Sequence, residues 1–133
     1  MPVILDASAM IAFLRRETGG DIVAGLLKEQ PPSCMAHALN LCEVFYDFLR
    51  SDDDAVACAA VDDLRALGLG VREDLDEPFW RQAGRFKVMF NMSLADAVAV
   101  ALAERFGAEL VTSDRGDFER VAQAGICRVR SIR

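Results

Sequence analysis

The feature that most constrains the fold is an alternation of short apolar segments with longer segments in which apolar residues recur at helical spacing. Strands that alternate with helices along a chain are typical of a parallel sheet with helices on its faces. The sequence therefore predicts an α/β fold with a central parallel sheet of about five strands. We expect strands at residues 3–5, 34–36, 69–71, 110–112 and 127–130, the last at a sheet edge, and helical segments from near residues 8, 20, 41, 56, 79, 94 and 114.

The length of 133 residues fits a single domain, residues 1–133. Hydrophobic residues make up 53% of the chain and charged residues 27%, which is typical of a globular domain and excludes a disordered chain. No apolar run approaches the roughly 18 residues that span a bilayer. The start of the chain reaches Asp6 too early for a signal peptide. We therefore expect a cytoplasmic protein that does not engage a membrane.

Charge and cysteine content narrow the chemistry. The net charge of −6 disfavours binding of nucleic acid through the overall field of the protein, although bound cations or a local basic patch could attract a polyanion. The four cysteines have no CxxC spacing and lie in apolar surroundings, so we expect buried thiols and neither a zinc cluster nor a disulfide framework. The single histidine, His37, excludes a multi-histidine metal site. Any chemistry must depend on carboxylates.

Four acidic residues fall at positions where an α/β fold places ligands. Asp6 and Asp114 follow two predicted strands, and Glu43 and Asp96 lie in the predicted first turns of helices. Each acid alone also fits a helix cap. Together in one crevice they would repel by about 3 kcal/mol per close pair, so such a cluster needs a cation. The cap alternatives are Asn40 with Glu43, Ser93 with Asp96, and Asp114 with Asp117.

Oxygen ligands alone suit Mg²⁺ or Mn²⁺, ions that also contact phosphate oxygens. Such ions activate water and stabilise charge during phosphodiester hydrolysis, and they make an acidic crevice attractive to nucleic acid. Ser8 and Thr112 stand beside Asp6 and Asp114 and could hydrogen-bond a carboxylate or a bound water, although a serine that opens a helix and a threonine in a strand are also common structural features.

Four segments in this order resemble the motifs of PIN-domain nucleases, and their spacing resembles that of the small VapC-type toxins of toxin–antitoxin pairs. The resemblance covers nearly the whole chain. Each motif alone is weak, whereas the four in order on an alternating α/β pattern are a strong signal. The segments are Leu5 to Ala9, Asn40 to Val44, Leu94 to Ala97 and Val111 to Phe118.

The resemblance implies a PIN-like three-layer α/β/α fold with sheet order 3-2-1-4-5 and a metal-dependent endoribonuclease activity with Mg²⁺ or Mn²⁺. It implies Asp6, Glu43, Asp96 and Asp114 as the catalytic and metal-binding acids, with Asp117 as a further metal ligand. It also implies an RNA substrate and a cognate antitoxin, and we expect a homodimer.

The chain departs from the family at two positions near these motifs. Ser113 stands where Asn or another polar residue is frequent, and His37 stands where Ser or Thr is common. Neither change removes an acid. Three basic residues near the motifs, Arg85, Lys87 and Arg115, could bind the RNA backbone, and the alternative for each is a solvated helix face.

Other functions stay open at this point. The family includes RNA-processing nucleases that are not toxins and inactive interaction modules, whose acids would be unrelated caps. An aspartyl-phosphate enzyme is disfavoured because Ser8 replaces the second acid and Lys28 is predicted far from the strand edge. A set of apolar residues exceeds what two helix stripes need and could form a groove or a dimer face, or could simply be core: Met10, Phe13, Leu14, Phe45, Phe48 and Leu49.

Overall fold

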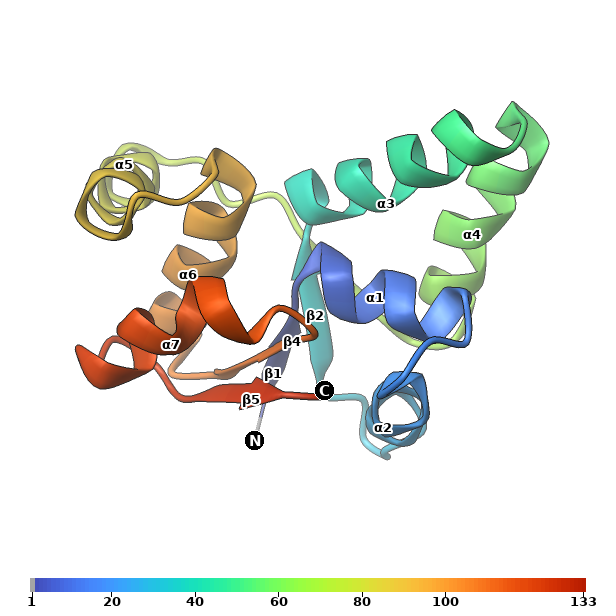
Figure 1. The fold of residues 1–133 in the computed structure, drawn as a ribbon, viewed down its shortest axis with the longest axis horizontal. Coiled ribbons are helices and arrows are strands. Elements are labelled where there is room, and N and C mark those ends of the chain that lie inside the picture. The colour runs from blue at the N-terminus through green and yellow to red at the C-terminus, as the bar shows by residue number, and fades with distance from the viewer. Residues whose placement is uncertain (1) are drawn as a thin grey trace.

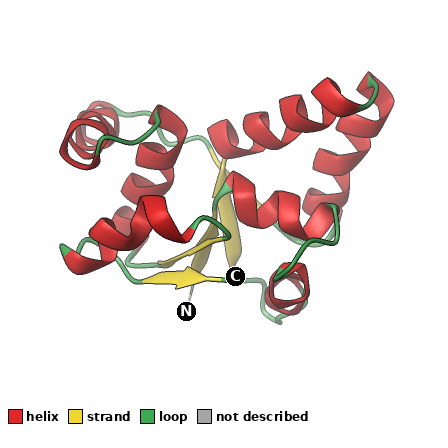
Figure 2. Ribbon diagram, viewed as in Figure 1, coloured by secondary structure: helices red, strands yellow, loops and turns green. Residues whose placement is uncertain are grey.

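Five parallel strands form one sheet in the order β3-β2-β1-β4-β5, with helices on both of its faces (Figure 1). The computed structural model describes residues 2–133. Helices α1 to α4 lie on one side of the sheet and α5 to α7 on the other, which gives three layers (Figure 2). The predicted α/β/α class and the sheet order are confirmed. The elements are β1 Val3–Leu5, α1 Ala7–Leu14, α2 Gly20–Leu27, β2 Cys34–His37, α3 Ala38–Ser51, α4 Asp54–Ala66, β3 Gly70–Arg72, α5 Glu77–Phe90, α6 Leu94–Phe106, β4 Glu109–Thr112, α7 Arg115–Gln123 and β5 Val129–Ser131.

The alternation of side chains along each strand explains how such short strands contribute to two hydrophobic cores. Side chains alternate between the two faces of a strand, so neighbours in the chain enter opposite layers. In β1, Leu5 packs with the residues of α1 to α4, whereas Ile4 packs with those of α5 to α7. In β4, Val111 and Leu110 divide in the same way. Strands buried on both faces need to be apolar throughout, which is the pattern that the sequence shows.

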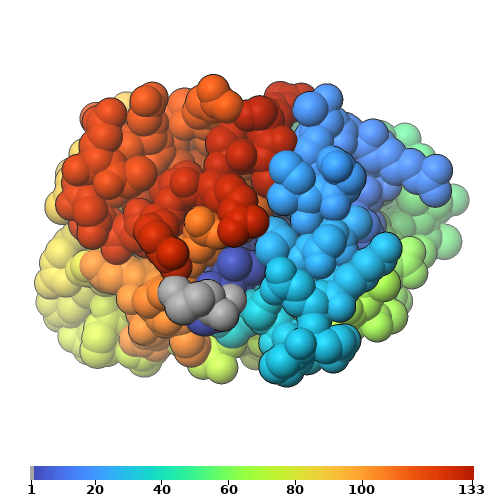
Figure 3. Space-filling view, turned by 90° about the horizontal axis from the view of Figure 1, so that it is seen from below, coloured from blue at the N-terminus to red at the C-terminus, as the bar shows by residue number. Residues whose placement is uncertain are grey.

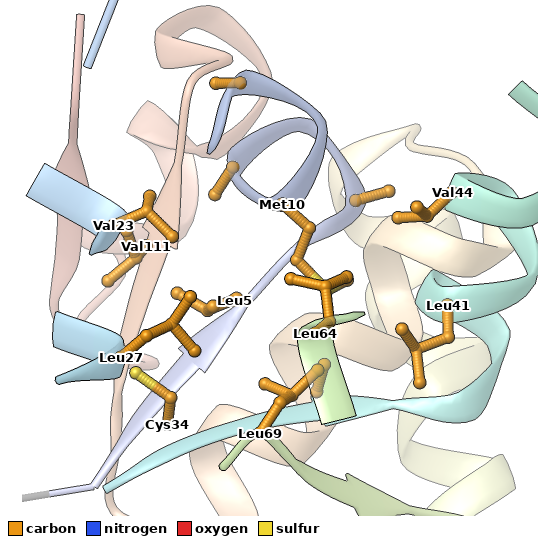
Figure 4. Packing of buried hydrophobic residues seen from close by; sticks show 14 of the residues in the cluster. Leu5, Met10, Val23, Leu27, Cys34, Leu41, Val44, Leu64, Leu69 and Val111 are labelled. Atoms are coloured by element: carbon orange, nitrogen blue, oxygen red, sulfur yellow. The ribbon is translucent and has the colours of Figure 1, made fainter. Parts of the chain in front are cut away.

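The core under α1 to α4 combines aliphatic side chains from five or more elements (Figure 4). Met10 of α1 is fully buried there beside Leu64 of α4 and Val44 of α3. This packing fixes α1 and α3 against β1 and β2. It therefore also fixes the start of each helix at the carboxyl edge of the sheet.

Two glycines permit close packing at the start of α2, Gly19 against the end of the chain and Gly20 against α1. Gly19 has φ +88°, and a Cβ atom there would lie 2.2 Å from the main-chain oxygen of Ile132. A Cβ atom on Gly20 would lie 2.6 Å from the main-chain oxygen of Ala12. Only glycine permits both approaches. Figure 3 shows the resulting contact between the segment that contains α2 and the C-terminal segment on one face of the molecule.

Several local expectations are wrong. The third and last strands are shifted toward the C-terminus relative to the predicted 69–71 and 127–130. Trp80, expected in the core with its neighbouring aromatics, is 50% exposed, because it lies off the stripe of α5 that carries Phe79 and Phe86. Of the four free cysteines, Cys34 is buried and Cys127 half-buried as expected, but Cys42 and Cys58 are exposed, since each lies off the buried stripe of its helix.

The apolar residues considered for a groove or dimer face divide between core and surface. Met10 and Phe48 are core, and Phe13, Leu14 and Phe45 are half-buried against it. Leu49 is exposed. Phe13 and Leu14 also line a cavity of about 800 Å³ that includes residues of α2.

Among residues 2–133, no single helix is long and apolar enough to cross a membrane, and only α5 and α6 taken together, with a bend of 119° between them, reach the required length and composition.

Candidate functional site

The centre of the candidate site is Asp6, at the point where β1 ends and α1 begins. Its carboxylate is 2% exposed. Oδ1 accepts hydrogen bonds from the main-chain N–H of Ala9 at 2.9 Å and from the Ser8 hydroxyl at 2.7 Å. The Thr112 hydroxyl donates to Oδ2 at 2.6 Å. Asp6 is therefore both the N-cap of α1 and a buried acid held by three donors, so its cap and site functions are compatible.

The two hydroxyl residues expected beside the acids tie three segments together. Besides its bond to Asp6, the Ser8 hydroxyl accepts from the main-chain N–H of Ser113 at 3.0 Å. The Thr112 hydroxyl accepts from the main-chain N–H of Asp114 at 2.9 Å. Each hydroxyl thus donates to the Asp6 carboxylate and accepts from the loop after β4. This arrangement fixes the Asp114 backbone relative to Asp6.

Glu43 lies on α3, and its side chain has an unsatisfied atom. The helix begins at Ala38, so Glu43 is in the second turn, and the expectation of a first-turn capping box with Asn40 is wrong. The cap is His37, whose ring accepts from the main-chain N–H of Leu39. Glu43 Oε1 is buried without a hydrogen-bond partner in the described structure. Burial, and then the charge of Asp6, raise the pKa of Glu43.

Asp96 is the acid whose pKa is affected by the largest number of the other acids. It lies in the first turn of α6, where its main-chain N–H donates to the Ser93 hydroxyl at 3.1 Å, so this predicted cap is confirmed. Burial, followed by the charges of Asp6, Glu43 and Asp117, raises the pKa of Asp96 to about 7. Carboxylates from the junction of β1 with α1 and from α3, α6 and α7 thus share one electrostatic environment. The N-terminal ends of α1, α3 and α6 lie around the carboxyl ends of the strands (Figure 1).

Asp114 and Asp117 form the exposed rim of the cluster. Asp114 occupies the N-cap position of α7 but its side chain makes no capping hydrogen bond, so a cap does not explain this acid. A side-chain hydrogen bond that protonated Asp117 donates to Asp114, followed by burial and the charge of Asp114, raises the pKa of Asp117. The charge of Asp114 also raises the pKa of Asp6, after the larger effect of burial. Each of the five predicted acids therefore has an electrostatic interaction with at least one of the others.

A metal ion fits the chemistry of this cluster. Buried polar atoms normally have partners, yet Glu43 Oε1 and Asn40 Oδ1 on adjacent turns of α3 have none. Both of these atoms are oxygens, and the carboxylates of the acids also offer only oxygen ligands. Mg²⁺ and Mn²⁺ prefer such oxygen ligands. In residues 2–133, no three Asp, Glu, His or Cys side chains are already arranged to hold one ion. The side chains thus supply the donors, and binding requires them to draw together.

The three predicted basic residues have different surroundings. The Arg115 guanidinium donates to the main-chain carbonyl of Arg133, and both residues line a cavity that also includes Asp114 and Ser8. Lys87 donates to the main-chain carbonyl of Met92, in the turn before α6. Arg85 is exposed on α5 and bonds to Gln82 of its own helix. Arg115 is therefore adjacent to Asp114, Lys87 is bound to the turn before α6, and Arg85 has its hydrogen bond, within the described residues, to its own helix.

Asn40 is a buried polar residue near the candidate site whose position the sequence did not predict. It is fully buried, with Nδ2 3.5 Å from the main-chain oxygen of Ala95 on α6. It thus lies between the helices that carry Glu43 and Asp96. Its helical spacing from Leu41, Val44 and Phe48 was the available signal, because an amide within a buried apolar stripe needs polar partners.

Comparison with known proteins agrees with this description of the fold. A family model described as the PIN domain matches residues 3–124. No curated protein matches the sequence.

Solved structures with the same fold come from several organisms. A chain of the VapBC2 complex of Rickettsia felis, bound to a DNA fragment from its promoter, matches with TM-score 0.77 and 15% identity over 98% of both chains. A chain of the DNA-bound VapBC complex of Salmonella typhimurium matches with TM-score 0.76 and 16% identity, over 100% of this chain and 99% of that one. PAE2754 of Pyrobaculum aerophilum matches with TM-score 0.67 and 21% identity, over 90% and 84%. At these identities the likeness is one of fold.

Proposed function

This chain belongs to the PIN domain family, and from that membership we propose that it is a metal-dependent endoribonuclease of the VapC type, the toxin of a type II toxin–antitoxin pair. It acts in the cytoplasm on RNA phosphodiester bonds, with Asp6, Glu43, Asp96 and Asp114 as the catalytic and metal-binding acids. The cofactor is Mg²⁺ or Mn²⁺, with Asp117 as an additional ligand.

The observation that carries this proposal is the pKa of Asp96, which burial and then three neighbouring carboxylates raise to about 7. Acids that only capped separate helices would not be expected to lie close enough to shift the pKa of one another. Strongly perturbed acids gathered at one sheet edge are typical of functional sites. The unsatisfied oxygen of Glu43 adds a donor without a partner to the same cluster.

The residues of this chain have distinct roles in the proposed site. Asp6 is held rigid by Ser8 and Thr112, so it supplies a fixed ligand oxygen rather than a mobile one. Asp96 holds a proton up to a pH of about 7 and releases it when a cation binds. A bound divalent cation would supply the positive charge that stabilises phosphodiester hydrolysis. Arg115, which lines the same cavity as Asp114, would contact an RNA phosphate in this proposal.

A cognate antitoxin and a homodimer are part of the same proposal. Complexes described as VapBC, or as a toxin–antitoxin complex from Klebsiella pneumoniae, contain chains with this fold. An antitoxin that covers the acidic crevice would benefit from basic side chains, since the uncompensated acids attract cations. Phe13 and Leu14, which line the cavity beside α2, offer an apolar contact for such a partner.

Sequencing of cleaved ends tests the proposed activity. Total RNA is incubated with the purified protein and Mn²⁺, with EDTA in a parallel reaction. We expect discrete cleavage sites in single-stranded segments with Mn²⁺ and none with EDTA. Intact RNA in both reactions, together with binding of an unrelated protein partner, would favour an inactive interaction module. Cleavage without growth arrest on expression would favour a processing nuclease.

A further inference from the structure

His37 links two parts of the fold that do not otherwise share hydrogen bonds in the described structure. It is the last residue of β2 and is 1% exposed. Its Nδ1 lies 3.1 Å from the main-chain nitrogen of Leu39, in the first turn of α3. Its Nε2 lies 2.9 Å from the main-chain oxygen of Asp74, in the loop between β3 and α5.

The two partners permit only one form of the ring. The N–H of Leu39 can only donate, so Nδ1 of His37 must be unprotonated. The carbonyl of Asp74 can only accept, so Nε2 must carry the proton. The imidazole is therefore neutral, in the Nε2–H tautomer, and both ring nitrogens are used.

The loop to which His37 donates is itself rigidly held. The Arg105 guanidinium of α6 pairs with Asp74 at 3.0 Å and with Asp76 at 2.7 and 2.8 Å. The His37 ring stacks on Phe79 of α5 with 5.6 Å between ring centroids and 11° between planes. The guanidinium of Arg105 lies 5.0 Å from the centre of the same Phe79 ring. His37 is thus fixed by contacts from α3, α5 and the β3–α5 loop, and through Phe79 and Asp74 it is joined to α6.

We propose that His37 is a positioning residue that sets where α3 holds Glu43 relative to Asp6 and Asp96. It contacts no acid of the site, and it acts through the capped end of the helix. This inference rests on the metal site proposed above. It assigns a role in that site to a residue that the family resemblance marks only as a departure.

The helix geometry shows why the cap matters for Glu43. Glu43 lies six residues after His37, about 9 Å along the helix axis. A tilt of about 10° at the capped end would displace the backbone at Glu43 by about 1.5 Å, a shift that changes how far its carboxylate must move to meet the other acids. Glu43 Oε1 has no hydrogen-bond partner of its own to correct such a shift. The direction of α3 therefore decides the position of this ligand.

Two substitutions at position 37 separate the two hydrogen bonds. In His37→Asn, the side-chain oxygen can replace Nδ1 and keep the bond from Leu39, while the bond to Asp74 is lost. In His37→Gln, the amide nitrogen can replace Nε2 and keep the bond to Asp74, while the cap of α3 is lost. Val23→Ala, at a buried position of α2, a helix that carries none of the proposed ligands, serves as a control for lowered stability.

The dissociation constant of Mn²⁺, measured by isothermal titration calorimetry at pH 8, is the readout. We expect His37→Gln to weaken Mn²⁺ binding tenfold or more, as loss of an outer-shell support typically does. His37→Asn should stay within about threefold of the wild type, because a side-chain oxygen preserves the cap. Val23→Ala should lower the melting temperature and leave the dissociation constant unchanged.

Equal Mn²⁺ binding by the wild type and His37→Gln would overturn the inference, and so would an equal loss in Val23→Ala. If His37→Gln does not fold, nitrogen-15 NMR of the wild-type imidazole decides, because a proton on Nδ1 contradicts the arrangement. A wild-type chain that binds no Mn²⁺ would refute the proposed function as well. Binding by the wild type with no effect of the Gln substitution refutes only the role of His37.

Discussion

The hydroxyl of Thr112 donates a hydrogen bond of 2.6 Å to Oδ2 of Asp6, although the two residues are 106 positions apart in the sequence. Adjacent parallel strands bring them together, since β1 pairs with β4 in the register Leu5 to Val111. The bond places an uncharged donor on a buried carboxylate whose pKa is raised by burial and by the charge of Asp114. It is therefore central to how the fold tolerates Asp6.

Replacing Thr112 by Val should test this relationship directly. The substitution keeps the shape of the side chain but removes the donor to Asp6 and the acceptor for the Asp114 N–H. We expect the free energy of unfolding at pH 7 to fall by about 1–3 kcal/mol, the typical effect of leaving a buried polar group unsatisfied. Urea denaturation measures this change. Thr112→Ser retains the hydroxyl and should lose clearly less stability, and equal losses in the two variants would refute the argument.

Asp96 should make the metal-free protein less stable as pH rises. Its pKa is about 7 in the folded state and lies near 3.8 in the unfolded chain. Between these values the folded state binds more protons than the unfolded state, so stability falls as pH increases through about 7.

The substitution Asp96→Asn should remove this pH dependence. Compared with the wild type, we expect it to raise the free energy of unfolding at pH 8 in EDTA by about 1–2 kcal/mol, a value discounted for solvent screening of the half-buried carboxylate. The difference should vanish near pH 4. Thermal unfolding across this pH range measures it, and a variant less stable than the wild type at pH 8 would indicate a capping role instead.

Divalent metal should stabilise the folded protein in a pH-dependent way. A ligand that binds only the folded state at 100 times its dissociation constant adds about 2.7 kcal/mol. Because Glu43 and Asp96 have raised pKa values and must lose protons to bind a cation, the increase in melting temperature with Mn²⁺ should be larger at pH 8 than at pH 5. EDTA should reverse it. An increase that is the same at both pH values would show that these acids are not the ligands.

The alternation of apolar runs with helical stripes was sufficient to predict a parallel sheet covered by helices, whereas the strand order came from the resemblance to PIN-domain nucleases. Ile4 and Leu5 are buried on opposite faces of the sheet, and an apolar run of this kind indicates a strand covered on both sides. The location of Asp6 and Asp114 at one edge of the sheet follows from this prediction, because parallel strands have their carboxyl ends at the same edge. These acids could be placed without knowing any side-chain contact.

The wrong predictions concern residues whose burial or capping role depends on tertiary packing. Asn40 was interpreted as a possible cap, but His37 takes that place and Asn40 is buried against α6, a contact 55 residues away. Trp80 was grouped with its aromatic neighbours, but it lies about 100° around α5 from Phe79, off the stripe of Phe79, Phe86 and Phe90, and is exposed. Local patterns do not specify which side of a helix will meet a distant element.

Expression in a bacterial host should show whether the chain is a toxin. We expect the wild-type chain to arrest growth and co-expression of the neighbouring small gene to restore it. Asp6→Asn should remove toxicity while preserving the complex, because Asn can still accept the N–H of Ala9 that caps α1. Growth curves and co-purification measure these outcomes. A harmless wild-type chain that co-purifies with no small protein would contradict the toxin assignment.

The most direct test of the central claim is the rate at which purified protein cleaves a labelled single-stranded RNA, with wild type and Asp96→Asn compared in Mn²⁺ and in EDTA. If the four carboxylates form one metal-dependent catalytic site, the wild type cleaves only with Mn²⁺, and folded Asp96→Asn is slower by at least about 100-fold, as expected when a positioned catalytic charge is removed. Equal rates for the two proteins, or cleavage by the wild type that continues undiminished in EDTA, would contradict the account.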